Sequence, residues 1–284
     1  MKAQGNEKRC PKHLLSSGLK EVIARVSNSQ LVAIFLDYDG TLSPIPRRVT
    51  KLERPLSETS RNIIYELSKQ NKIRIFIISG RTVESLKRLV GIDNIHYIGV
   101  HGHIIRGPDI EYIHSALEGF KNVIKDIRDR IIETLSKVEG VVVEDKGVAL
   151  SIHYRGVDRD RSREILEQVS RISSEYYGVK LSKGKKILEV LPNTGWDKGK
   201  AIDYVLAVLS TKTGLSTNNM VPIYFGDDKS DENGFKLLRG KGMGVRVGYR
   251  CSTNAEYYVD STDDVVRFLN DLRRWVSSNP DQKP

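Results

Sequence analysis

Hydrophobic residues in the first hundred positions follow one repeating pattern. Near-continuous apolar runs occupy residues 31–36 and 73–78, and a shorter run occupies 96–100. The segments between these runs place their apolar residues at helical spacing. Strands that are apolar on both faces and separated by amphipathic helices are typical of a parallel sheet covered by helices on both sides. We therefore expect an α/β core, preceded by a polar lead and a helix over residues 14–26.

The pattern changes near residue 107, where helical segments begin to alternate with paired strands. Each pair of strands flanks a short turn that contains glycine, which is a signal for a β-hairpin. The predicted elements are helices at 117–135 and 161–177 and strands at 141–144, 148–154, 179–182 and 186–190. From Trp196 the first pattern resumes. We therefore predict a Rossmann-like parallel-sheet core, residues 1–106 and 193–284, with a small antiparallel α+β domain, residues 107–192, inserted in its middle.

Composition and charge narrow the class of protein. The formal net charge is +10, but no dense basic run alternates with stacking aromatic residues, so we expect no nucleic-acid partner and only a modest attraction for anionic substrates. No apolar run approaches the length of a membrane span, and the first twenty residues lack the apolar region of a secretory signal. We expect a cytoplasmic protein that does not bind membranes and is a monomer or small homo-oligomer.

The two cysteines, Cys10 and Cys251, lie near opposite ends of the chain. They form no CxxC or Cys/His pattern of the kind that binds metals. We interpret them as two incidental free thiols in a reducing compartment.

Two aspartates follow the first apolar run, in the segment FLDYDGTL. Asp37 and Asp39 are two residues apart and precede a glycine and Thr41. Ligands of open α/β sheets bind in the crevice at the carboxyl ends of the strands, and both side chains would face that crevice. Taken alone, the segment is equally consistent with a solvated turn, because Asp and Gly are good loop formers.

A second acidic cluster changes this balance. The segment GDDKSDE follows the predicted strand at 221–225 and contains Asp227, Asp228 and Asp231. Two such clusters at the ends of parallel strands would crowd like charges around one crevice, which is costly unless a hard cation is bound. Ligands that are all oxygen favour Mg²⁺ over zinc. The sequence therefore predicts a magnesium site.

Two further residues suit an anionic substrate. Ser79, in the segment SGR, follows the second apolar run, and its hydroxyl and the next helix N-terminus can hold phosphate oxygens. Lys198, in the segment DKGK, starts a helix near the second acidic cluster and can neutralise a phosphate. Each signal is weak alone. Their order along the chain is more specific: DxDGT, then Ser, then Lys, then GDDxxD.

That order resembles the haloacid dehalogenase-like phosphotransferases over nearly the whole chain. The resemblance implies that Asp37 attacks phosphorus and becomes an aspartyl phosphate, while Asp39 protonates the leaving oxygen and then deprotonates water. It also implies the rest of the site: Mg²⁺ held by Asp37, the carbonyl of Asp39 and Asp227, support from Asp228 and Asp231, and a phosphoryl group bound by Thr41, Ser79 and Lys198.

Finer matches resemble the trehalose-6-phosphate phosphatases of this superfamily. They are the segments LDYDGTL, SGR, GVHGH, LSIHYR, EVLP and GDDKSDENGF. The resemblance implies a C2-type cap domain inserted between the SGR and lysine motifs, and trehalose 6-phosphate as the substrate. In that family, charged cap residues bind the sugar hydroxyls, and the matching positions here are Glu144, Lys146, Arg155, Lys186 and Glu189.

The sequence departs from the family pattern at two places, and alternatives remain. The acid of GxHGxE is missing after His103, and the arginine before Pro192 is replaced by leucine. A phosphatase for another sugar phosphate or a glycosyl-phosphoglycerate would share the same core. A response-regulator receiver is much shorter, a cation pump needs membrane segments, and a silent binding protein would not need Asp39. We interpret His101 and His103 as structural or hinge residues.

Overall fold

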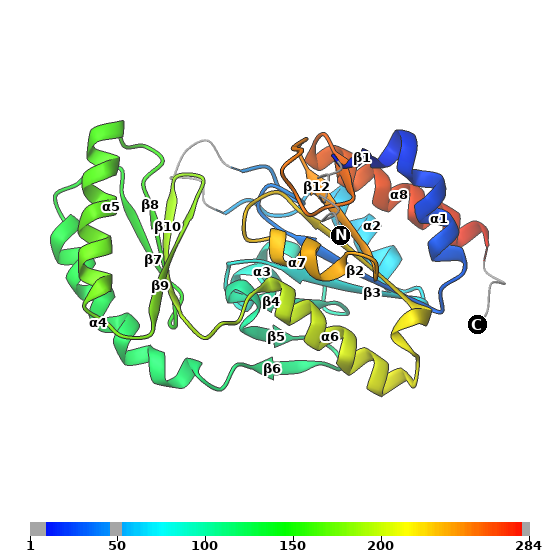
Figure 1. Ribbon diagram of the computed structural model, residues 1–284, viewed down its shortest axis with the longest axis horizontal. Helices are drawn as coiled ribbons and strands as arrows, with labels where there is room; N and C mark the ends of the chain where they lie inside the picture. Colours follow the sequence, from blue (N-terminus) through cyan, green and yellow to red (C-terminus); the bar gives the residue numbers. More distant parts are fainter. Residues whose placement is uncertain (1–9, 46–52, 280–284) are drawn as a thin grey trace, which may run out of the picture.

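The computed structural model describes residues 10–45 and 53–279, which form two units, each built on its own sheet (Figure 1). The larger unit, here called the core, holds a nine-stranded sheet in the order β1-β13-β12-β11-β2-β3-β4-β5-β6. Neighbours from β1 to β4 in this order are parallel, and β5 and β6 extend the sheet in antiparallel fashion. The strands are β1 (Lys12–His13), β2 (Leu31–Asp37), β3 (Ile73–Ile78), β4 (His96–Gly99), β5 (Ile104–Arg106), β6 (Glu111–Ile113), β11 (Met220–Gly226), β12 (Met243–Val247) and β13 (Tyr257–Val259).

Helices cover both faces of this sheet, as the apolar runs predicted. Successive side chains of a strand point to opposite faces, so Ile34 of β2 packs toward α1, α2, α3 and α8, whereas Phe35 packs toward α6 and α7. The helices are α1 (Leu19–Ser27), α2 (Glu58–Ser68), α3 (Val83–Val90), α6 (Lys198–Thr213), α7 (Glu232–Leu238) and α8 (Thr262–Ser278). Within the described part of the chain, every helix is too short or too polar to serve as a membrane span.

The smaller unit, here called the cap, holds a four-stranded antiparallel sheet in the order β7-β8-β10-β9. Two helices lie on the face of this sheet that is turned away from the core (Figure 1), and Ile127, Ile131 and Val169 on them pack against Ile152 and Val190. The elements are α4 (Leu117–Leu135), β7 (Val142–Asp145), β8 (Leu150–His153), α5 (Arg159–Ser174), β9 (Val179–Gly184) and β10 (Ile187–Pro192). The two predicted hairpins and two predicted helices are confirmed, with ends shifted by a few residues.

The chain passes from core to cap after β6 and returns after β10. Strand β6 (Glu111–Ile113) pairs with β5 in the nine-stranded sheet, although the sequence analysis assigned these residues to the inserted domain. His103 lies buried between the two connections. Its Nδ1–H donates to the carbonyl of Val100 (2.7 Å), and its Nε2 accepts from the hydroxyl of Thr194 (2.9 Å). Burial lowers the pKa of His103 to about 4, so this side chain is neutral near pH 7.

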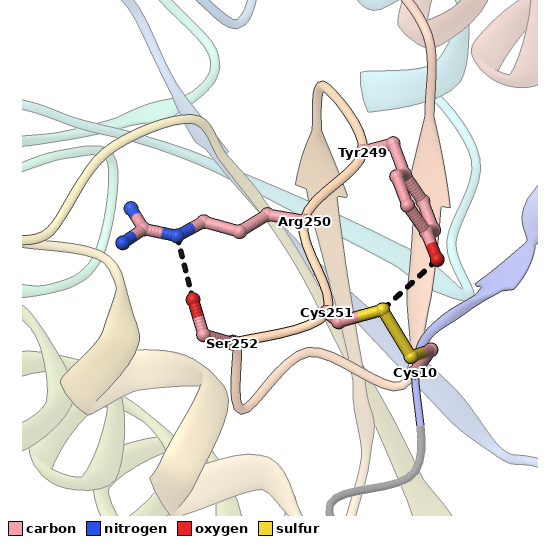
Figure 2. Close-up of a disulfide and its surroundings, with 5 residues drawn as sticks. All are labelled: Cys10, Tyr249, Arg250, Cys251 and Ser252. Atoms are coloured by element: carbon pink, nitrogen blue, oxygen red, sulfur yellow. Dashed lines mark hydrogen bonds between the residues drawn. A yellow bond between two sulfur atoms is a disulfide. The ribbon is translucent and has the colours of Figure 1, made fainter.

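The prediction of free cysteines is wrong, because the fold joins Cys10 and Cys251 in a disulfide (Figure 2). Strand β1 pairs in parallel with β13 at the edge of the core sheet. This pairing carries Cys10, two residues before β1, to the loop between β12 and β13 that holds Cys251. The helix predicted from residue 14 also begins later, at Leu19, after a π-helical turn over Leu14–Gly18.

Candidate active site

Both acidic clusters meet at the carboxyl edge of the core sheet, as predicted. Strand β2 ends at Asp37 and pairs with β11, which ends one residue before Asp227. The turn after β2 passes close to the second cluster at Gly40. Its φ is +90°, and a Cβ there would lie 2.4 Å from Cγ of Asp227. Only glycine allows this approach, because other residues strongly disfavour such a φ and would also clash.

The acidic group has the composition of a divalent metal site. Carboxylate oxygens of Asp37, Asp227 and Asp231 lie within 4.8 Å of one another, and all three residues are buried. Lys198 Nζ donates to Asp37 and to Asp231, each at 2.7 Å. Burial raises the pKa of Asp37 well above its usual range, the other two carboxylates add to this shift, and Lys198 opposes it. Lys198 and, from the cap, Lys185 (Nζ 2.7 Å from Asp227) face these three carboxylates. Two ammonium groups do not neutralise three ionised carboxylates, and a divalent cation would supply the missing positive charge.

Asp231 supports this group from behind. One of its oxygens accepts from Lys198 Nζ and from the hydroxyl of Tyr224, and the other accepts from the backbone N–H groups of Asp227 and Asp228, both at 2.9 Å. A carboxylate has about four acceptor positions, so these four hydrogen bonds leave Asp231 little capacity to bind a cation. Its geometry suits the supporting position that the resemblance implied.

Two hydroxyl residues of the core suit a phosphate. Thr41 is fully buried, and within the described part of the chain its Oγ1 has no hydrogen-bond partner. Leaving a buried hydroxyl unpaired costs about 1–3 kcal/mol, so this atom suits a ligand oxygen. Ser79 follows β3, is buried, and lines the same cavity as Asp37. Thr41 lies a few residues after Asp37 in the sequence and is buried, but it is not among the residues that line the cavity. The binding of a phosphoryl group by Thr41 and Ser79 stays a prediction.

Asp39 is held by a residue that the sequence analysis did not single out. Arg81 donates through Nε and Nη2 to the two carboxylate oxygens of Asp39, at 2.6 and 2.8 Å. Paired hydrogen bonds of this kind are among the strongest in proteins and fix orientation. Arg81 belongs to the SGR segment, so the motif contained the signal.

The cap contributes a second charged group above the aspartates. Glu189 on β10 is 8% exposed and accepts from Lys146 Nζ (3.0 Å), Ser151 Oγ (3.3 Å) and His101 Nε2 (2.9 Å). Although burial alone would raise it, the pKa of Glu189 is held well below its usual range by His101 and Lys146. Glu189 is therefore ionised.

Of the other predicted cap residues, Glu144 and Arg155 line the cavity and Lys186 does not. Glu144 on β7 accepts from His153 Nε2 on β8 (3.0 Å), and Arg155 donates to the carbonyl of Lys185 (3.0 Å). All four residues line the cavity. His153 and Lys185 were not predicted, although His153 stands in the alternating segment SIHY.

Lys186 does not reach the cavity. Its Nζ donates to the carbonyl of Val157 and to Ser162 Oγ inside the cap, and it is the neighbouring Lys185 that points to the core, with Nζ 2.7 Å from Asp227. The predicted hairpin turn was placed too early. Gly184 pairs with Ile187, so the turn consists of residues 185 and 186 rather than 183–185.

One cavity collects the groups from both units. The side chains that line it from the core include Asp37, Asp39, Ser79, Arg81, His101, Lys198, Asp227 and Asp228, and those from the cap include Glu144, Lys146, Ser151, His153, Arg155, Lys185 and Glu189. Its floor is acidic and its roof carries hydrogen-bonding charged groups, an arrangement that suits a polyhydroxylated ligand with one phosphate.

A family model and named relatives identify the chain as a haloacid dehalogenase-like hydrolase, a class that generally uses a divalent metal, and the fold agrees. The chain belongs to the trehalose-phosphatase family, whose model matches residues 35–263.

Named relatives agree with this assignment, and a solved structure shares the fold. The chain is 35% identical over 272 residues to probable trehalose-phosphate phosphatase 4 of Oryza sativa subsp. japonica, with 93% of this chain and 72% of that protein covered. It is 32% identical over 267 residues to trehalose-phosphate phosphatase B of Arabidopsis thaliana, covering 90% and 69%. The C-terminal domain of C. albicans trehalose-6-phosphate phosphatase has the same fold, with a TM-score of 0.76, 24% identity, and 94% and 98% of the two chains covered.

Proposed function

We propose that this protein hydrolyses trehalose 6-phosphate to trehalose and phosphate, with Mg²⁺ as its metal and an aspartyl phosphate as intermediate. The observation that carries the proposal is the convergence of Asp37, Asp227 and Lys198, from three separate segments, beneath a cap whose charged side chains face the same cavity. Named relatives of this chain are trehalose-phosphate phosphatases.

In the proposed first step, an oxygen of Asp37 attacks phosphorus, and the bond between phosphorus and the sugar oxygen breaks. Lys198, Thr41 and Ser79 hold the oxygens of the transferring group, and the unpaired hydroxyl of Thr41 supports this placement. The leaving sugar oxygen takes a proton from Asp39. This is chiefly positioning and charge neutralisation, as in other phosphoryl transfers.

In the second step, water attacks the phosphorus of the aspartyl phosphate and the bond to Asp37 breaks. Asp39 takes the proton that water loses, so it ends the cycle protonated as it began. Arg81 holds Asp39 by two hydrogen bonds. Asp39 must therefore exchange part of this pairing for the substrate oxygen as the substrate enters.

The metal would be held by Asp37, the backbone carbonyl of Asp39 and Asp227, with Asp228 and Asp231 supporting them. When bound, Mg²⁺ supplies positive charge to the phosphoryl oxygens and to the attacking carboxylate. We choose Mg²⁺ because the donor set is entirely oxygen and small. The residues of the cap, Glu144, Lys146, Arg155 and Glu189, would bind sugar hydroxyls.

The test is phosphate release from a panel of sugar phosphates by the purified protein with Mg²⁺. We expect trehalose 6-phosphate to give the highest kcat/KM, and Asp37→Asn to abolish release while circular dichroism stays unchanged. A higher kcat/KM for another sugar phosphate or a glycosyl-phosphoglycerate would overturn the assignment of trehalose 6-phosphate as substrate, while the assignment of the reaction as phosphate hydrolysis would stand. Substantial turnover by Asp37→Asn would exclude Asp37 as nucleophile.

We propose further that the enzyme acts in the cytoplasm, alone or as a small homo-oligomer, without a nucleic-acid partner. Size-exclusion chromatography with light scattering tests the assembly, and a mass above that of a tetramer would contradict it. Fractionation of the source cells tests the location.

A further inference from the structure

His101 belongs to the core, but its side chain meets the cap. It lies in the turn after β4 (Val100–Gly102), and its Nε2 lies 2.9 Å and 2.8 Å from the two carboxylate oxygens of Glu189 on β10. The side chains of His101 and Glu189 are only 13% and 10% exposed. This hydrogen-bonded pair therefore joins the two units inside the cavity, beside the groups assigned to the sugar.

The backbone at this turn is strained and held in place. Val100 and His101 have φ of 48° and 54°, a region that residues other than glycine rarely adopt. Conformations of this kind cost about 1–3 kcal/mol and persist where the surroundings impose them. Here Val100 N–H donates to the carbonyl of Arg81 (2.8 Å) and His101 N–H to that of Ser79 (3.0 Å). The segment that holds the phosphate-binding serine thus fixes the position of His101.

Gly80 leaves the space through which His101 reaches the cap. A Cβ at Gly80 would lie 2.5 Å from Nε2 of His101 and 3.2 Å from Glu189 Oε1. Even a methyl group there would displace the imidazole from the carboxylate. The glycine of the SGR segment, the strained turn and the cap glutamate therefore form one arrangement.

An ion pair on the surface also joins the units. Lys185 on the cap bonds Asp227 (2.7 Å), and its side chain is 61% exposed. Exposed pairs contribute little, about 0–1 kcal/mol, and a cation bound by Asp227 would compete with this one. The buried pair between His101 and Glu189 is independent of the metal.

We propose that His101 is a positioning residue that couples closure of the cap to recognition of the sugar. When the cap closes, His101 orients Glu189 for the sugar hydroxyls. When the cap opens, Glu189 keeps Lys146 and Ser151, which move with it, but loses this contact with the core. This inference rests on the proposed function for its substrate but not for its structural part.

The test compares two amide variants of His101 that differ in reach. His101→Gln keeps a donor at nearly the same reach, whereas the shorter amide of His101→Asn cannot reach Glu189, and Asn tolerates positive φ well. We expect His101→Asn to lower kcat/KM for the sugar phosphate 10- to 100-fold, the usual effect of losing a hydrogen bond to a charged group. Turnover of a small aryl phosphate should stay within about twofold, and His101→Gln should recover most of the loss.

Small-angle X-ray scattering supplies a readout besides activity. His101→Asn should increase the radius of gyration of the free protein, because the cap opens, and His101→Gln should not. His153→Asn is the matched control, since His153 pairs with Glu144 within the cap. It should weaken sugar turnover without changing the radius.

The outcomes separate this inference from the proposed function. Equal loss of aryl phosphate and sugar phosphate turnover in His101→Asn, or an unchanged radius of gyration, overturns the coupling role. If wild-type protein prefers another sugar phosphate, the same comparison is made with that substrate. If it hydrolyses none, the proposed function fails, and the scattering experiment still decides whether His101 holds the cap.

Discussion

Removal of the disulfide between Cys10 and Cys251 is expected to destabilise the core by about 5 kcal/mol. The bridge spans 241 residues of sequence. In the chain-entropy description, closing a loop of that length restricts the unfolded chain by an amount that grows with the logarithm of loop length, which gives about 5 kcal/mol at 25 °C. Both cysteines are exposed, so a reductant can reach the bridge.

Urea unfolding followed by circular dichroism measures this effect. With a slope of about 3 kcal/mol per molar urea, the loss corresponds to a midpoint lower by about 1.5–2 M. The bridge lies wholly in the core, and the cap has a hydrophobic core of its own. If the two units unfold in separate transitions, only the core transition should move.

The double variant Cys10→Ser/Cys251→Ser is the matched control. It should unfold at the same urea midpoint as the reduced wild-type protein, and adding a reductant should not change that midpoint. An oxidised wild-type protein that unfolds at the same urea concentration as the double variant would refute the reasoning. Labelling with a thiol reagent under denaturing conditions checks the pairing itself, and two reactive thiols without prior reduction would contradict it.

Three further predictions concern the site and the connections. Gly40→Ala should abolish phosphate release, since its Cβ would meet Asp227, whereas Gly214→Ala, at φ of +69° in open space, should cost about 1–2 kcal/mol in urea unfolding and keep activity. The pKa of His103 is about 4 when folded and 6.5 when exposed, so the unfolded chain binds the proton first as pH falls. Stability should therefore drop by about 3 kcal/mol between pH 6.5 and pH 4, and a His103→Gln variant with the same pH profile would contradict this. Lys198→Met leaves buried carboxylates without their counter-ion. It should lower the free energy of unfolding, measured in urea, by about 3–5 kcal/mol without Mg²⁺ and by less with Mg²⁺. An equal loss of stability in both buffers would argue against a metal at this site.

Features that follow from strand periodicity could be predicted from the sequence. Asp37 and Asp227 each follow a run that is apolar on both faces, and such runs belong to the middle of a parallel sheet, where strand ends share one edge. The pairing of β2 with β11 confirms this. The short glycine-containing turns between paired strands likewise predicted the cap hairpins.

Features set by turn geometry were harder to predict from the sequence. In the second hairpin the turn lies at residues 185 and 186, and Lys186 has φ of 60°. Because side chains alternate along a strand, a small shift of the turn exchanges which lysine faces the cavity. Local pattern contains no information about that shift, so Lys186 was expected where Lys185 lies.

Contacts between segments that are distant in the chain were also missed in the sequence analysis. Strand β1 has only two residues, too few for any periodicity, and its neighbour β13 is more than 240 residues away. The disulfide depends on that pairing and was missed with it. The contact between His101 and Glu189 was missed for the same reason, since it depends on how the cap sits on the core.

The neighbourhood of β2 and β11 also constrains how the newly made chain matures on the ribosome. Strand β2 (31–37) can pair with β11 only after residues 220–226 have been synthesised. Both cap hairpins and their helices are complete by residue 192. Because synthesis runs from the N-terminus to the C-terminus, the cap can fold before the two segments that form the core are both available. Catalytic competence would then be the last property that a nascent molecule acquires.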